Sequence, residues 1–73
     1  MQHDLKIKYE FAQLHFQGKK DWEIRLNDRD FKTGDWVQFT VLEFGFVYSR
    51  QITNVFEGFG LEKNYVILSI KND

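Results

Sequence analysis

The sequence predicts a small α+β domain that is mostly β, a curled sheet or small barrel of about five strands with one main helix. Five segments are predicted as strands, and residues 3–8 and 21–26 alternate apolar and polar residues with the period of two that is typical of half-buried strands. Only one segment, near the N-terminus, has the apolar spacing of a helix. The chain has 73 residues, enough for one core, so residues 1–73 are predicted to form a single domain. Curling is expected because it leaves fewer exposed edges than a flat sheet of five strands.

The first half of the chain predicts a strand, a helix and a second strand. Residues 3–8 alternate as a strand, and residues 9–17 suit a short helix with one apolar face. Gly18 follows directly, at the position where helices most often end because glycine readily adopts the left-handed conformation. Residues 21–26 alternate again. Their apolar side chains are predicted to face the core: Trp22, Ile24 and Leu26.

Three further strands are predicted at residues 36–44, 48–56 and 64–71, the first of them with Val37, Phe39 and Val41 on one side. Gly45 lies at the expected hairpin tip between the first two of these strands. A loop with two glycines separates the last two strands. Polar turns before residue 36 connect this half to the first.

Composition limits the classes of function. The net charge is −1 and the isoelectric point is about 6.1, whereas proteins that bind nucleic acid through bulk electrostatics are usually strongly basic. Any nucleic-acid binding is therefore expected at a local cleft. The chain has no cysteine and two histidines without paired carboxylates at ligand spacing, so we predict no metal site and no cofactor. It also has no apolar run of about 20 residues and no signal-peptide pattern, which predicts a cytoplasmic protein without membrane contact.

Three charged residues form the most informative cluster. Glu23 and Arg25 are two residues apart on a predicted strand, so their side chains leave the same face. Lys20 lies at the entry to that strand and can join them. The cluster is either an ordinary wet surface, where such ion pairs contribute about 0–1 kcal/mol, or the floor of a polar binding site. Periodicity alone leaves both interpretations open.

Two other polar residues, His3 and Arg29, have two interpretations each, and His15 has one. His3 shares a strand face with Leu5, so it is either a partly buried histidine or a polar contact at the mouth of the cleft. Arg29 either bridges a turn to a neighbouring strand or lies at the rim of the cleft and meets a phosphate. His15 is predicted on the surface of the helix.

The predicted hairpin tip around Gly45 is unusually apolar. Its aromatic side chains are Phe44, Phe46 and Tyr48. They either fold back onto the core or form an exposed patch for a partner chain, including a homodimer, or for a stacked base.

The spacing of Gly18, Lys20, Glu23 and Arg25 resembles the G-x-K-x-x-E-x-R signature of the ASCH domains, which belong to the PUA-like superfamily of RNA-associated β-barrels. The resemblance extends to the DUF3850 branch of that family through four further blocks, at residues 3–6, 27–35, 57–61 and 65–70. It implies a PUA-like barrel with a cleft between helix and sheet, suited to a nucleobase or similar ligand.

The resemblance implies binding of RNA or a nucleotide-like ligand by Lys20, Glu23 and Arg25, with His3 and Arg29 as further contacts and without catalysis. The alternative is a hydrolase acting on modified nucleosides or RNA. A related amidohydrolase for acetylated cytidine has G-x-K-x-x-T-x-R, and here Glu23 occupies the position of the threonine nucleophile. In such an enzyme Lys20 and Glu23 would be the acid/base groups. The third alternative is a protein-interaction or dimerisation module.

Overall fold

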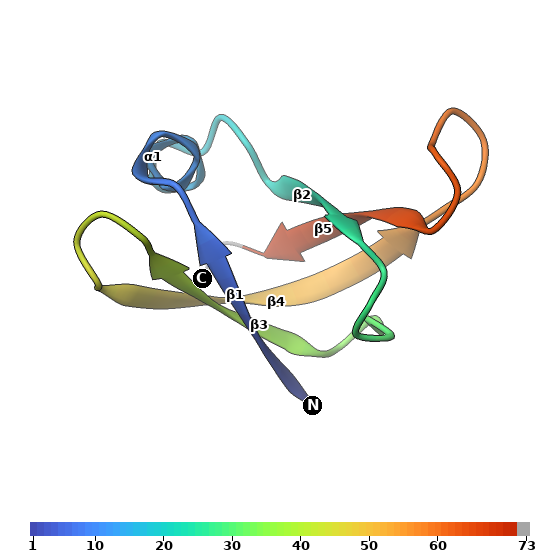
Figure 1. Cartoon of the computed structure of the whole chain (residues 1–73), viewed down its shortest axis with the longest axis horizontal. Coiled ribbons are helices and arrows are strands. Elements are labelled where there is room, and N and C mark those ends of the chain that lie inside the picture. Colours follow the sequence, from blue (N-terminus) through green and yellow to red (C-terminus); the bar gives the residue numbers. More distant parts are fainter. Residues whose placement is uncertain (72–73) are drawn as a thin grey trace.

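The computed structural model describes residues 1–71 and has the predicted order of elements (Figure 1). These are β1 (Gln2–Ile7), α1 (Tyr9–Phe16), β2 (Trp22–Leu26), β3 (Trp36–Val41), β4 (Val47–Phe56) and β5 (Tyr65–Lys71). The largest difference from the predicted bounds is in β3, which was expected to reach residue 44. It ends at Val41 because the carbonyl of this residue accepts hydrogen bonds from the N–H groups of Phe44 and Gly45, which closes a turn.

The strands form one curled sheet in the order β1-β3-β4-β5-β2. The β1–β3 pair is parallel and the other pairs are antiparallel. The sheet is a half-barrel, because its two edge strands, β1 and β2, do not pair with each other. They still lie near each other, since Arg25 Nη2 of β2 donates to the Lys6 carbonyl of β1 at 2.9 Å. In Figure 1, α1 lies at one end of this opening, and the β4–β5 loop lies at the far end of the sheet.

The core fills the concave side of the sheet. Alternate residues of β1, β3 and β5 are buried, as the period of two predicts. Phe39, at the centre of β3, is the largest fully buried side chain. The buried apolar residues are Leu5, Ile7, Ala12, Phe31, Val37, Phe39, Val41, Ile52, Val66, Leu68 and Ile70.

The prediction that Trp22, Ile24 and Leu26 face the core is wrong. These side chains are 41%, 47% and 47% exposed, whereas Glu23 between them is only 5% exposed. Glu23 lies opposite buried Leu68 of β5 and therefore shares the concave face. The Glu23 carboxylate can be buried because cationic side chains and a histidine surround it. Trp22, Ile24 and Leu26 lie on the outer face of β2, an edge strand, and that face stays uncovered.

The end of α1 determines where Lys20 lies. Gly18 has a φ of +71°, and its N–H donates to the His15 carbonyl at 3.1 Å. The N–H groups of Lys19 and Lys20 both donate to the Leu14 carbonyl. These bonds end the helix and turn the chain toward β2.

Gly18→Ala is expected to destabilise the domain by about 1 kcal/mol, because a side chain in the left-handed region is strained even in open space. Urea unfolding followed by circular dichroism measures this loss. Gln17→Ala, at the neighbouring exposed position, is the matched control and should change stability by less than about 0.5 kcal/mol. An equal effect of the two substitutions would contradict the role assigned to Gly18.

Candidate functional site

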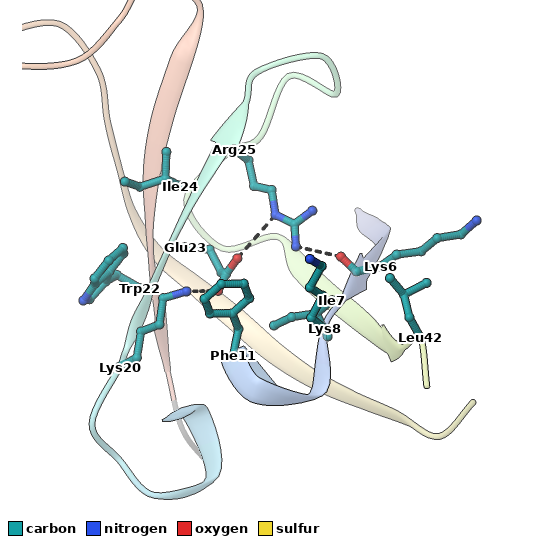
Figure 2. Close-up of a pocket in the computed structure, with 10 residues that line it drawn as sticks. All are labelled: Lys6, Ile7, Lys8, Phe11, Lys20, Trp22, Glu23, Ile24, Arg25 and Leu42. Atoms are coloured by element: carbon teal, nitrogen blue, oxygen red, sulfur yellow. Dashed lines mark hydrogen bonds and ion pairs between the residues drawn. The ribbon is translucent and has the colours of Figure 1, made fainter. Parts of the chain in front are cut away.

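A cleft of about 490 Å³ opens between the two edge strands of the half-barrel, beside α1 (Figure 2). One wall comes from β1, α1 and the β3–β4 turn, and the other from β2 and from Lys20, two residues before it. Its lining residues are Lys6, Ile7, Lys8, Phe11, Lys20, Trp22, Glu23, Ile24, Arg25 and Leu42.

Glu23 is the centre of the polar groups in this cleft. Its Oε1 accepts hydrogen bonds from Lys20 Nζ at 2.7 Å and from His15 Nε2 at 3.0 Å. Its Oε2 lies 3.4 Å from Arg25 Nε (Figure 2). The structure therefore brings Lys20, Glu23 and Arg25 together, with a concave space beside them. Within residues 1–71, Oε2 has only this one long contact, so it keeps acceptor capacity for a ligand.

The surroundings of Glu23 keep its carboxyl group ionised at neutral pH. Burial raises its pKa, but hydrogen bonds from His15 and Lys20, together with the charges of Lys20 and Arg25, outweigh burial. The pKa of Glu23 therefore lies below its ordinary value.

A hydrogen-bonded chain continues from Glu23 into the core. An ionised carboxylate only accepts, so His15 Nε2 carries the hydrogen that binds Glu23. In the neutral ring, His15 Nδ1 then accepts from the Tyr48 hydroxyl, at 2.7 Å. Burial and the nearby charge of Glu23 raise the pKa of Tyr48, which keeps this hydroxyl protonated. The chain Tyr48–His15–Glu23 fixes the position of the carboxylate.

The prediction that His15 lies on the helix surface is wrong, since only 2% of it is exposed. His15 packs against the rings of Phe39 and Tyr48, with centroid distances of 5.2 and 5.9 Å. Two sequence signals could have indicated this burial. Ala12 lies three residues before His15 and so shares its helix face, and Glu23 is an acceptor near enough along the chain to satisfy a buried imidazole.

Lys20 also contacts two aromatic rings. Its Nζ lies 4.9 Å from the ring centroids of both Phe11 and Trp22. Such contacts add attraction between the ammonium and the faces of the rings. Both rings remain partly exposed, so they are available at the cleft as apolar surfaces beside a cation.

The cleft is electropositive although the chain as a whole carries a charge of −1. Glu23 is the one carboxylate among its lining residues, against the cations Lys6, Lys8, Lys20 and Arg25. Within residues 1–71, the ammonium groups of Lys6 and Lys8 form no ion pair, so neither is neutralised by a neighbour. This local excess of positive charge attracts anionic ligands.

His3 and Arg29 do not line the cleft. His3 is buried, with Nε2 2.8 Å from Asp35 Oδ2 and its ring edge-on to Phe31. It is thus a buried histidine with a partner, the first of its two predicted interpretations. Arg29 borders a separate hollow of about 310 Å³ near Met1 and Asp35. Its Nε lies 3.7 Å from Asp28, within the turn.

The aromatic hairpin tip has both predicted properties. Tyr48 is half-buried and packs on the core through Phe39, with ring centroids 5.1 Å apart. Phe44, in contrast, is 65% exposed, and Phe46 is 41% exposed.

Two structural features are absent from residues 1–71. No three acidic or histidine side chains in this part of the chain are grouped as a metal ion would require. No helix there has the length and apolarity needed to cross a membrane.

Comparison with known proteins gives one family. No curated protein matches the chain. The family model described as "Domain of unknown function (DUF3850)" matches residues 2–70. This range includes α1, the strand residues that line the cleft and the Gly18–Arg25 segment. This match covers nearly the whole sequence, and the chain therefore belongs to the DUF3850 family.

Proposed function

We propose that this domain binds RNA or a nucleotide-like ligand in the cleft around Lys20, Glu23 and Arg25, without catalysing a reaction. The observation that carries the proposal is the electropositive cleft with partly exposed aromatic rings on a chain that is otherwise slightly acidic. A nucleotide combines the two features that such a cleft recognises, a phosphate and a planar base.

The lining residues have complementary roles in this proposal. Phosphate oxygens would accept hydrogen bonds from Arg25 and from Lys8, which has no ion pair within the described chain. A base would pack on Phe11, and an amino or imino group of that base would donate to the free lone pairs of Glu23 Oε2.

The distances favour binding over hydrolysis. The Lys20 ammonium donates to Glu23 at 2.7 Å, and an ammonium has no lone pair with which to act as a base or nucleophile. Glu23 has a lowered pKa, so it is a weaker base than an ordinary carboxylate. The ionised pair thus combines a weak acid with a weak base, whereas its charged donor and acceptor groups suit the binding of a ligand.

Two observations support placing this DUF3850 chain among the ASCH domains of the PUA-like superfamily. The spacing of Gly18, Lys20, Glu23 and Arg25 agrees with the signature of that family. The curled five-stranded half-barrel with one helix beside its opening agrees with a PUA-like architecture.

The test is a titration with the four ribonucleoside monophosphates and a short oligouridylate, read as ligand-dependent thermal stabilisation and as Kd by calorimetry. We expect binding to weaken about tenfold in Lys8→Ala, because a phosphate contact is lost. Arg25→Ala should abolish the thermal stabilisation, because it removes the central donor of the cleft. Lys63→Ala, outside the cleft, is the matched control and should leave Kd unchanged.

Two results would contradict the proposal. One is the absence of stabilisation by any member of the panel. The other is an equal Kd for the wild type and both cleft variants. Release of acetate from N4-acetylcytidine, lost in Lys20→Ala, would instead favour the hydrolase.

A further inference from the structure

Four aromatic side chains form a second surface, outside the cleft. This aromatic surface consists of Phe16 of α1, Phe44 and Phe46 of the β3–β4 turn, and Tyr48 of β4. The ring of Phe46 is nearly parallel to those of Phe16 and Phe44, with interplanar angles of 27° and 16° and centroid distances of 6.1 and 6.4 Å. The ring of Tyr48 packs edge to face against that of Phe16, with a centroid distance of 4.7 Å. The ring planes of Phe16, Phe46 and Phe44 are thus roughly parallel.

One cation adjoins this aromatic surface. The Arg50 guanidinium carbon lies 4.9 Å from the ring centroid of Tyr48 and 5.9 Å from that of Phe16. Its one hydrogen bond within the described chain is to the Ser49 carbonyl, at 2.8 Å, and it forms no ion pair there. The guanidinium is therefore held against rings with most of its donors still available.

The aromatic surface is continuous with the cleft. Leu42 lines the cleft, and Phe44 lies two residues further along the same turn. Phe44 also packs edge-on against Tyr9, at the first residue of α1, with a centroid distance of 4.9 Å. Figure 1 shows the β3–β4 turn beside α1. Because Leu42 lines the cleft and Phe44 packs against α1, the turn connects the cleft with the aromatic surface.

We propose that the ligand is a single-stranded RNA of several nucleotides, with one nucleotide in the cleft and the following bases stacked on Phe44, Phe46 and Phe16. This inference rests on the proposed function and specifies its ligand class. Single-stranded nucleic acids bind proteins through stacked aromatic side chains beside cations that contact the phosphates. Arg50 provides that cation here, and Lys8 provides one at the cleft.

A second copy of this chain suits the same surface less well. Symmetric pairing through the rings would bring Arg50 into the interface, where its charge loses water. The carboxylate of the same turn, Glu43, already accepts a hydrogen bond from the Tyr9 N–H, at 3.0 Å. RNA provides bases that stack on the aromatic side chains and a phosphate that binds the Arg50 guanidinium.

The experiment compares uridine monophosphate with a uridine hexanucleotide by calorimetry on the full chain. The hexanucleotide should bind at least tenfold more tightly. Phe44→Leu and Phe46→Leu keep the apolar character of the turn, and each should weaken hexanucleotide binding about tenfold while Kd for the monophosphate stays unchanged. Arg50→Gln should reduce the dependence of hexanucleotide affinity on salt. Phe59→Leu is the matched control, since Phe59 is 96% exposed in the β4–β5 loop and should affect neither ligand.

The outcomes separate this inference from the proposed function. If the monophosphate binds but the hexanucleotide binds no more tightly, or if both turn variants bind the hexanucleotide like the wild type, the extended site is wrong and the cleft proposal stands. If neither ligand binds, both are wrong. A dimer in sedimentation that dissociates in Phe46→Ser, with hexanucleotide binding unchanged, assigns the aromatic surface to self-association instead.

Discussion

Glu23→Ala is expected to destabilise the domain by about 3 kcal/mol, which corresponds to a fall in Tm of roughly 10–20 °C for a chain of this size. The substitution leaves the Lys20 ammonium, the His15 imidazole and the Arg25 guanidinium beside a cavity with no carboxylate. This loss of stability lies at the lower end of the range of about 3–5 kcal/mol for a broken buried ion pair, because Lys20 and Arg25 retain some contact with water. Thermal unfolding followed by circular dichroism measures it.

Glu23→Gln is the matched control, because glutamine keeps the size of the side chain and can still accept hydrogen bonds. We expect it to lose less stability than the alanine variant. An alanine variant as stable as the wild type would mean that the cluster around Glu23 contributes nothing to folding.

The glutamine variant also isolates the pH dependence of Glu23. Because the pKa of this group is lower in the folded protein than its ordinary value of 4.5, the unfolded chain takes up the proton first as the pH falls. The carboxylate therefore stabilises the fold above about pH 4.5, and that stabilisation is lost as the pH falls through the folded-state pKa. The difference in unfolding free energy between the wild type and Glu23→Gln should be largest near neutral pH and shrink below pH 4.5. A constant difference down to pH 3 would contradict the lowered pKa.

Phe39→Ala is expected to cost about 3–5 kcal/mol, because it removes a fully buried ring and leaves a cavity that the sheet cannot close. This loss is comparable with the total stability of a small domain, so part of the population should be unfolded at 37 °C. Phe39 packs on both His15 and Tyr48, so the substitution also removes the support under the chain of hydrogen bonds to Glu23. Urea unfolding and native-state hydrogen exchange measure the two effects.

Phe39→Leu separates packing from ring contacts, since leucine fills much of the cavity and should recover part of the lost stability. Phe59→Ala, at the surface, should cost less than about 0.5 kcal/mol. If Phe39→Ala cost no more than the Phe59 substitution, the position of Phe39 at the centre of the core would be wrong.

The sequence predicts the elements well because their signals are local. The alternation of β1 and the glycine after α1 depend on neighbouring residues only, and the bounds agree within three residues. Glu23 and Arg25 share a face because of their spacing on β2, and Lys20 joins them from the segment between α1 and β2. Which strands lie side by side depends on contacts between distant segments. The parallel β1–β3 pair and the open edge at β2 are therefore beyond the reach of periodicity.

Polarity alone misplaces two side chains, because burial depends on available partners as well. Trp22 and Ile24 are more apolar than Glu23, yet Glu23 is the buried one, since a lysine, an arginine and a histidine from three parts of the chain surround it. His15 is buried for the same reason. These polar groups bind one another, and the Tyr48 hydroxyl and the Lys6 carbonyl add further hydrogen bonds. A residue-by-residue ranking of hydrophobicity therefore assigns all of them to the surface.

The strand order places the two walls of the cleft on opposite edges of the sheet. β1 and β2 are the outermost strands on opposite sides, with β3, β4 and β5 between them. β2 has one neighbour, β5, so its position depends on the last strand of the described chain, and β1 likewise depends on β3 alone. No fragment of the domain can assemble the pocket by itself, and occupancy by a ligand would report that the whole sheet, from first strand to last, is in place.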